Sequence, residues 1–272
     1  MNKVQDLISV ADPAPIVVER FGDVSPFLLI ADHAGNRVPA ALGTLGLPQT
    51  ELDRHIGIDI GILGVGRGLA RHLGTTLVHQ PYSRLVIDCN RQPGRTDAMP
   101  AVSDGTEVPG NRDLDPEARA LREAAIFRPY HDGIAAEIDA RHAVGRQTVL
   151  VALHSFTPKH GDYSEPRPWE IGVLWNRDAR LAHALIDVLV AEGGLTVGLN
   201  EPYGVSDDVD YAIPVHAEAR GLLHVEIEIR QDQLIDTTGE AVWAARLARL
   251  LPLALLKSEL MPNRPTQGQA LK

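Results

Sequence analysis

TVLVALHSF, residues 148–156, is the stretch that decides the fold. It consists of an unbroken apolar run that ends at a histidine. A short aliphatic run of this kind is typical of a strand that is buried on both faces of a parallel sheet. Similar runs recur along the chain, and we predict strands at residues 27–31, 75–79, 84–88, 148–153, 171–175, 195–199 and 223–229.

Amphipathic stretches separate these runs and predict helices at about residues 60–73, 116–143, 179–192 and 238–256. Alternating strands and helices predict an α/β fold, here a three-layer α-β-α sandwich around a mixed, mostly parallel central sheet. We expect one domain over residues 1–272, with its core at about 16–256 and a short flexible C-terminal tail. Long polar loops at residues 90–115 and 157–169 are expected to serve function.

Composition excludes several classes of partner. Lys and Arg number 26 against 36 Asp and Glu, a net charge of −10, and no basic run is present. Nucleic acid and anionic membranes are therefore poor partners. The opening segment lacks an apolar signal core, and Arg246, Arg249 and Pro252 interrupt the last apolar stretch. The single cysteine, Cys89, excludes an intrachain disulfide and favours a cytoplasmic location; the oligomeric state is not predicted.

Polar residues cluster where the predicted strands end. The sequence DHAGN follows the strand at 27–31, DCNR ends the strand at 84–88, and HSF follows the strand at 148–153. The last strand itself carries Glu226, Glu228 and Arg230. Ligands of open α/β sheets bind outside the carboxyl ends of the strands, so these clusters predict one common site.

His33 and His154 stand at two of these strand ends. Two histidines and a carboxylate are the minimal protein ligand set of a catalytic zinc site with one position open to water. A single histidine would be better explained as a capping or satisfied polar group. Two histidines at corresponding strand ends make a metal site as plausible as that explanation. Glu228 would be a general base if its strand points at the metal, although a half-exposed strand would show the same alternation without any function.

Arg84 and Arg91 flank the third cluster, YSRLVIDCNR. Guanidinium groups bind carboxylates through paired hydrogen bonds, and an acidic protein with an acidic substrate needs such local positive charge. Asp88 and Asn90 are close enough in sequence to orient Arg91. The alternative is a pair of surface arginines.

Together the segments DHAGNRVP, DRHIGIDIG, YSRLVIDCNR, LHSFTP, NEPY and EIRQDQLID, in this order over about residues 27–236, resemble the N-formylglutamate amidohydrolase family. The resemblance implies a phosphorylase/hydrolase-like fold shared with zinc carboxypeptidases and aspartoacylases. It also implies one Zn²⁺ per chain, hydrolysis of the amide bond of N-formyl-L-glutamate or a related N-acyl acidic amino acid, and a link to histidine degradation.

The resemblance also implies roles for individual residues. His33 and His154 would bind the metal, Glu228 would be the general base, and Arg84 would polarise the scissile carbonyl. Asn90 and Arg91 would hold the substrate carboxylate. Further candidates for the substrate pocket are Asn200, Tyr203, His216 and Arg230.

The third metal ligand departs from the zinc carboxypeptidase pattern. Those enzymes have a glutamate three residues after the first histidine, where this chain has Asn36, and an amide oxygen is a poor zinc ligand. We therefore propose Asp59 as the third ligand, with the alternative that Asp59 only orients His33.

Two other functions stay open from the sequence. One is a zinc deacylase or carboxypeptidase-like enzyme for another N-acyl amino acid or a peptide, which the loops at 92–115 and 157–169 would decide. The other is a non-catalytic domain that binds or senses small anions.

Overall fold

A seven-stranded sheet forms the centre of the computed structural model, which describes residues 7–161 and 165–261. The strand order is β1-β3-β2-β6-β9-β7-β8, and all neighbours are parallel except β1 with β3 and β7 with β9. The strands are β1 (Val17–Arg20), β2 (Phe27–Ala31), β3 (Thr76–His79), β6 (Val149–Phe156), β7 (Ile171–Leu174), β8 (Val197–Leu199) and β9 (Leu223–Arg230). A separate hairpin consists of β4 (Val102–Ser103) and β5 (Thr106–Glu107).

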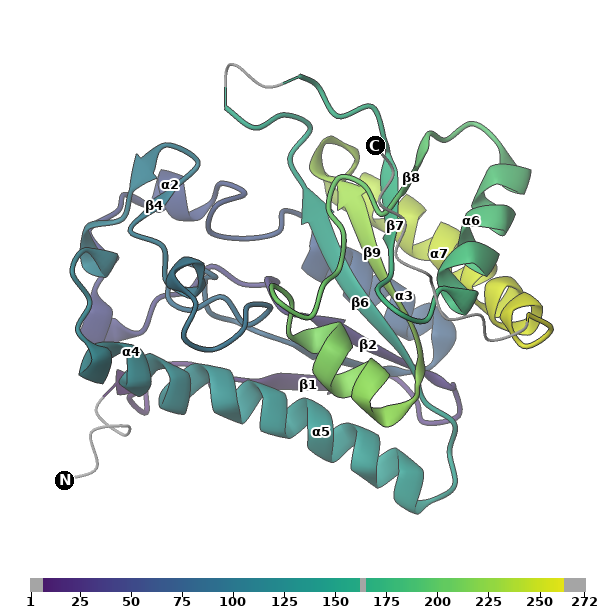
Figure 1. The fold of residues 1–272 in the computed structure, drawn as a ribbon, viewed down its shortest axis with the longest axis horizontal. Coiled ribbons are helices and arrows are strands. Elements are labelled where there is room, and N and C mark those ends of the chain that lie inside the picture. The colour runs from purple at the N-terminus through teal and green to yellow at the C-terminus, as the bar shows by residue number, and fades with distance from the viewer. Residues whose placement is uncertain (1–6, 162–164, 262–272) are drawn as a thin grey trace.

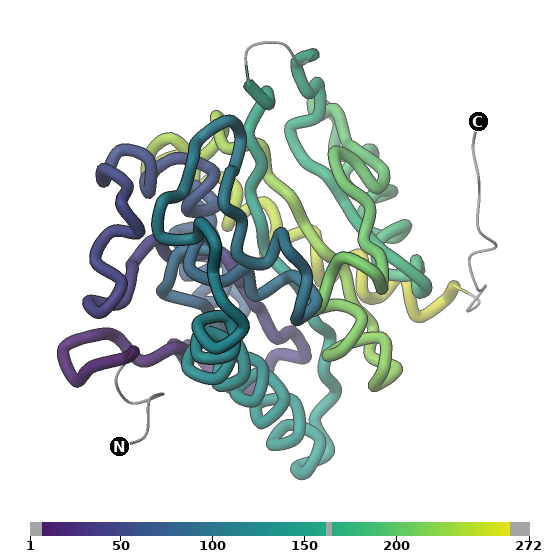
Figure 2. Tube along the Cα trace, turned by 60° about the vertical axis from the view of Figure 1, so that its left-hand side comes forward, coloured from purple at the N-terminus to yellow at the C-terminus, as the bar shows by residue number. Residues whose placement is uncertain are grey.

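Helices cover both faces of this sheet, as the sequence predicts (Figures 1 and 2). The α-helices are α2 (Gln49–Leu52), α3 (Ile62–Leu73), α4 (Pro116–Arg122), α5 (Arg128–Ala143), α6 (Arg180–Glu192) and α7 (Thr237–Ser258). Short 3-10 turns are η1 (Ala40–Leu42), η2 (Thr96–Ala98), η3 (Pro109–Asn111), η6 (Glu218–Arg220) and η7 (Gln231–Gln233). Two π-helical turns are η4 (Glu123–Phe127), which joins α4 to α5, and η5 (Ile213–Ala217).

The central strands are buried on both faces, which confirms the predicted α/β class. On β6, Val149, Val151 and Leu153 pack into the core beneath α3, α6 and α7. Leu150 and Ala152 face the opposite core, which α5 covers. Burial on both faces explains why β6 reads as a continuous apolar run instead of an alternating one.

The predicted strand at residues 84–88 is wrong. This segment is a buried turn, in which the amide of Val86 donates to the carbonyl of Ser83 at 2.9 Å. The carbonyls of Leu85 and Val86 accept hydrogen bonds from the side chains of Asn111 and Arg122 instead of from a neighbouring strand. Strand β1, which the sequence analysis missed, pairs with β3 at the edge of the sheet.

The helix predictions are confirmed to within two residues at each end. Helix α7 begins at Thr237 because the carboxylate of Asp236 accepts hydrogen bonds from the first amides of the helix. Helix α3 ends at Leu73, where Gly74 adopts a left-handed conformation with φ of 61°. Most of the predicted C-terminal tail lies beyond Met261, outside the described residues. No helix in the described ranges is long and apolar enough to cross a membrane.

Candidate active site

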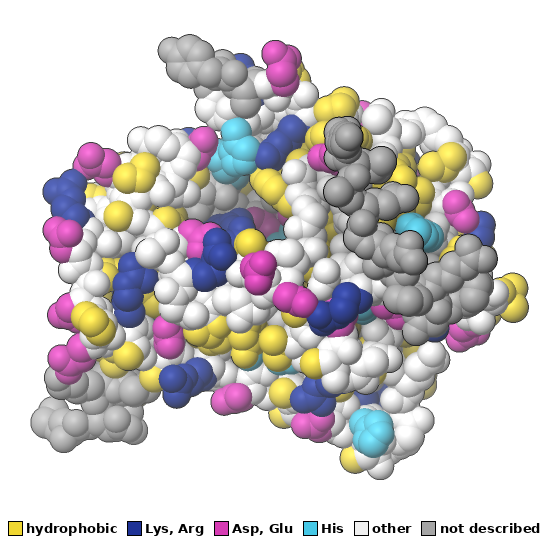
Figure 3. All heavy atoms as spheres, viewed as in Figure 1, with side chains coloured by type: hydrophobic (Ala, Val, Ile, Leu, Met, Phe, Trp, Pro, Cys, Tyr) yellow, Lys and Arg dark blue, Asp and Glu magenta, His cyan; other side chains and the backbone are white. Residues whose placement is uncertain are grey.

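A cavity of about 700 Å³ opens at the carboxyl ends of β2, β6 and β9, where the sequence analysis places the site. Figure 3 shows the corresponding hollow, with acidic and basic side chains inside it. Eight of the residues predicted for the site line this cavity: His33, Asp59, Arg84, Asn90, Arg91, His154, Tyr203 and Glu228.

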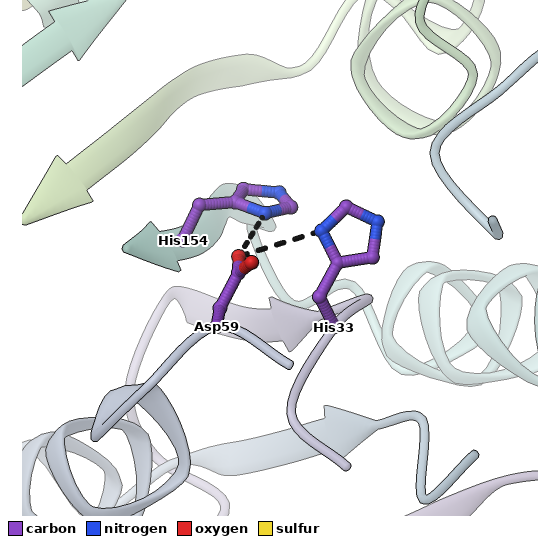
Figure 4. Close-up of side chains that lie close together, drawn as sticks. All are labelled: His33, Asp59 and His154. Atoms are coloured by element: carbon purple, nitrogen blue, oxygen red, sulfur yellow. Dashed lines mark hydrogen bonds and ion pairs between the residues drawn. The ribbon is translucent and has the colours of Figure 1, made fainter. Parts of the chain in front are cut away.

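The three predicted metal ligands converge at the bottom of the cavity. His33 follows β2, His154 lies in β6, and Asp59 precedes α3 (Figure 4). Asp59 Oδ2 lies 2.9 Å from His154 Nδ1 and 3.4 Å from His33 Nδ1. We call these three residues the inner group. One ligand atom from each residue lies within 4.8 Å of the others, so the inner group could hold a metal ion. All three side chains are buried.

The hydrogen bonds around His33 test whether a metal fits. His33 Nε2 lies 2.7 Å from Asp88 Oδ1, so Nε2 carries a proton and donates it in a hydrogen bond to this carboxylate. This leaves Nδ1 as a buried atom that has no hydrogen-bond partner in the described ranges and faces the Asp59 carboxylate. A lone pair against a carboxylate is repulsive unless a proton or a cation lies between them. Two nitrogen donors and one oxygen donor suit zinc, so the inner group fits the metal.

The same contacts bear on the role of Asp59. Asp88, not Asp59, anchors the ring of His33, in the arrangement of carboxylate and histidine that is common behind bound zinc. Asn36, the alternative ligand, donates a hydrogen bond to Asp53 at 2.6 Å and lies outside the cavity lining. The geometry therefore favours Asp59 over Asn36.

Asp88 also holds Arg84, whose Nη2 donates to Asp88 Oδ2 at 2.7 Å. Arg84 Nη1 lies 3.4 Å from Asp59 Oδ1. Burial alone would raise the pKa of both carboxyl groups, but Arg84 lowers the pKa of Asp88 and His33 lowers that of Asp59, and the net shift is downward. Both carboxylates are therefore ionised, and together they more than neutralise the single positive charge that Arg84 brings to the site.

Glu228 lies directly opposite His154 in the pairing of β6 with β9. Its Oε2 atom is buried and has no hydrogen-bond partner in the described part of the chain. Burial raises the pKa of Glu228 to about 8, with opposite effects from His154, which lowers it, and Asp59, which raises it. The half-exposed strand considered from the sequence is not observed, because Glu226 and Glu228 are both buried. A carboxyl group with a pKa near neutrality is suited to proton transfer.

Arg91 and Asn90 are joined through Asp210. Arg91 Nη1 donates to Asp210 Oδ1 at 3.2 Å and to the carbonyl of Asn90 at 3.1 Å. The side-chain oxygen of Asn90 accepts hydrogen bonds from the amides of Tyr211 and Ala212. Asn90 thus holds the 211–212 segment in place, while Arg91, with 24% of its side chain exposed, faces the cavity. The expected contact of Asp88 with Arg91 is replaced by its pairing with Arg84.

Three predicted substrate residues are not among those that line the cavity. The side chain of Asn200 accepts a hydrogen bond from the amide of Trp175, and His216 lies 2.9 Å from His131. Arg230 donates to Asp232 and to carbonyls of the 167–169 segment. We leave these three residues out of the functional proposal. Tyr203 does line the cavity.

Known proteins are similar to this chain over most of its length. The family model described as N-formylglutamate amidohydrolase matches residues 25–235. This chain belongs to the N-formylglutamate amidohydrolase family. A gene product of Agrobacterium tumefaciens with a known crystal structure is 40% identical and has a TM-score of 0.87, over 93% of this chain and 99% of that one.

The N-formylglutamate amidohydrolase of Ralstonia eutropha shares the fold, with a TM-score of 0.63 and 22% identity over 91% of this chain and 98% of its own. No curated protein matches the chain.

Several residues of the cavity escaped the sequence analysis. Asp88 was expected to orient Arg91, and its contact with His33 joins residues 55 positions apart. Three further residues, His55, Asp104 and His160, gather in the outer part of the same cavity. His55 stands in the family-like segment DRHIGIDIG, so its motif was visible although its neighbours were not.

Proposed function

We propose that this chain hydrolyses the amide bond of N-formyl-L-glutamate or of a closely related N-acyl acidic amino acid, with one zinc ion in the inner group. Membership of the amidohydrolase family supports the reaction class. The observation that carries the proposal is the convergence of His33, Asp59 and His154 in the cavity that Glu228 also lines. The buried Oε2 atom of Glu228 has no hydrogen-bond partner among the described residues.

Zinc would be held by the Nδ1 atoms of His33 and His154 and by the carboxylate of Asp59. When bound, zinc supplies Lewis acidity, which polarises a carbonyl and lowers the pKa of water. In the metal-free protein a hydrogen bond joins His154 to Asp59. Metal binding therefore displaces a proton from this pair, and the affinity for zinc should rise with pH.

Glu228 is proposed as the general base and acid of the reaction. Its Oε2 atom accepts the proton of the attacking water and then delivers it to the leaving nitrogen. Arg84 keeps its guanidinium beside the reacting centre, held by Asp88, and its field favours the developing oxyanion. Arg91, with Asn90 supporting its position, binds the carboxylate of the amino acid.

The substitution Glu228→Gln tests this assignment. Glutamine preserves the size of the side chain but cannot accept and return a proton, so turnover should fall by about 10²- to 10⁴-fold. Zinc content should stay unchanged. Glu192→Gln is the matched control, because Glu192 pairs with Arg246 and Arg249 on the other side of the sheet and should leave turnover at the wild-type level. Near wild-type turnover of Glu228→Gln would refute the role.

A panel of substrates separates the proposal from its alternatives. Zinc-loaded protein is incubated with N-formyl-glutamate, N-acetyl-glutamate and N-formyl-aspartate, and the released amine is measured. Preference for N-formyl-glutamate supports the proposal, whereas faster release from an N-acetyl substrate indicates a deacylase. Binding of these anions without any release indicates a sensing domain. The proposal includes a cytoplasmic location, since Cys89, the single cysteine, is free and buried.

A further inference from the structure

Three side chains from distant segments meet in the outer part of the cavity. His55 follows α2, Asp104 stands at the tip of the β4–β5 hairpin, and His160 follows β6. One ligand atom from each lies within 4.8 Å of the others, and all three residues line the cavity. We call them the outer group. None of them belongs to the inner group.

The carboxylate of Asp104 lies between the two imidazole rings. Its Oδ2 atom is 3.1 Å from His55 Nε2, and its Oδ1 atom is 3.8 Å from His160 Nδ1. The two-residue turn of Asp104 and Gly105, both with positive φ, places this carboxylate at the hairpin tip. One oxygen thus lies near each ring, and the three residues bring their donor atoms within reach of a single ion.

The two histidines show features of metal ligands. His160 Nε2 lies 3.2 Å from the hydroxyl of Tyr203, so the ring is oriented through the nitrogen that does not face Asp104. Such an outer hydrogen bond fixes the orientation of most zinc-binding histidines. His55 Nε2 is buried and has no hydrogen-bond partner of acceptable geometry in the described part of the chain. A cation beside Asp104 would satisfy this atom.

Among the neighbouring cationic side chains of the described residues, Arg54 contacts Asp104. Arg54 Nη2 approaches Asp104 Oδ2 to 3.4 Å and would by itself oppose a metal ion. Its Nη1 atom, however, pairs with Glu51 and donates to Thr106 at 2.8 Å. Glu51 therefore balances the charge of Arg54, and the carboxylate of Asp104 remains to balance that of a cation.

We propose that His55, Asp104 and His160 form a second metal site, which takes a divalent transition-metal ion that prefers nitrogen and oxygen donors, such as zinc. The site goes beyond the proposed function, which uses one ion in the inner group. Three protein donors leave positions for water, and 44% of the His160 side chain is exposed, so this site binds zinc more weakly than the inner group. An ion in this site would link three segments that line the same cavity as the inner group.

Zinc binding to the full chain tests the proposal. Protein stripped with a chelator is dialysed against increasing free zinc, and bound metal is measured by mass spectrometry. We expect two zinc ions per chain in the wild type, with loss of the weaker one in His160→Ala and in Asp104→Asn. His154→Ala should lose the tighter one. His142→Ala is the control, because this exposed histidine of α5 lies outside both groups and should retain both ions.

The variants separate failure of the two sites. A wild type that binds one zinc, lost in His154→Ala and retained in His160→Ala, would overturn the outer site and leave the proposed function intact. One zinc that is lost in His160→Ala and retained in His154→Ala would support the outer site and overturn the inner one. Cobalt(II) gives a second readout: the absorption band of the weaker site should disappear in Asp104→Asn, and persistence of both bands would count against the proposal.

Discussion

The substitution Asp88→Asn tests how the inner group is held in place. Asp88 Oδ1 lies 2.7 Å from His33 Nε2 and accepts a hydrogen bond from the backbone amide of Asn90 at 2.9 Å. Asp88 Oδ2 accepts two hydrogen bonds from Arg84. Asparagine has the same shape but no charge, and its NH₂ group cannot accept hydrogen bonds. Either the anchor of His33 or that of Arg84 is therefore lost, whichever way the amide is turned.

The expected loss in metal affinity follows from these contacts. Removing the outer carboxylate of a metal-bound histidine weakens metal binding by about 10- to 100-fold, or about 1.4 to 2.7 kcal/mol. A second effect adds to it here. Arg84 would be left with Asp59, 3.4 Å away, as its remaining carboxylate partner, and would compete with the metal for that ligand. We therefore expect a loss near the upper end, about 100-fold.

The affinity is measured by competition for zinc with a chromophoric chelator at constant pH. Asp187→Asn is the matched control, because Asp187 forms an exposed ion pair with Lys257 and is not among the residues that line the cavity. It should bind zinc as the wild type does. If Asp88→Asn binds zinc within about threefold of the wild type, the proposed support of His33 by Asp88 is refuted.

Three further substitutions test other parts of the molecule. Arg91→Lys keeps the charge but loses the forked geometry, so KM should rise about tenfold with kcat nearly unchanged; a fall in kcat alone would contradict carboxylate binding. Burial raises the pKa of Glu226 to about 8. The folded state then retains a proton that the unfolded state releases above its ordinary pKa. The unfolding free energy of the metal-free protein should therefore fall by up to about 1.4 kcal/mol per pH unit between about pH 5 and pH 8, and urea titrations of Glu226→Gln should lack this contribution. A Cβ at Gly35 would lie 2.1 Å from the carbonyl oxygen of Pro81, so Gly35→Ala should destabilise the fold by about 1 to 3 kcal/mol in thermal unfolding.

The fold class was predictable because the central strands are buried on both faces. Such strands have little choice of residue type, and β2, β6 and β9 appear in the sequence as short apolar or alternating runs. The segment at 84–88 has the same composition, yet it is a turn. What distinguishes it is the source of its hydrogen bonds, the side chains of Asn111 and Arg122, which lie far along the chain. Local composition does not reveal such partners.

The candidate site was predictable to the extent that strand ends carry it. His33, His154 and Glu228 follow from the rule that the carboxyl ends of parallel strands share one edge, and the structure brings them together there. The pairing of His33 with Asp88 and the position of Asp59 depend on how two loops fold back over that edge. Neither spacing in the sequence nor residue type determines these contacts.

The charges of the site differ from those that the sequence predicts for the binding of an acidic substrate. Arg84 and Arg91 were expected to supply free positive charge, but Arg84 pairs with Asp88 and approaches Asp59, and Arg91 pairs with Asp210. At the bottom of the cavity two ionised carboxylates, Asp59 and Asp88, face one guanidinium and the ring of His154. Burial lowers the pKa of His154, but the hydrogen bond to Asp59 raises it well above its usual value, so the ring carries a proton and these four side chains have no net charge.

A divalent cation that displaces the proton of His154 would give the inner group and its neighbours one net positive charge. Attraction of the substrate carboxylate then depends on the metal as well as on Arg91, because a buried unit charge dominates the local potential. It follows that the metal-free protein should bind an N-acyl acidic amino acid poorly even with every arginine in place. The acidic character of this protein and the acidity of its proposed substrate are compatible only when the inner group holds its ion.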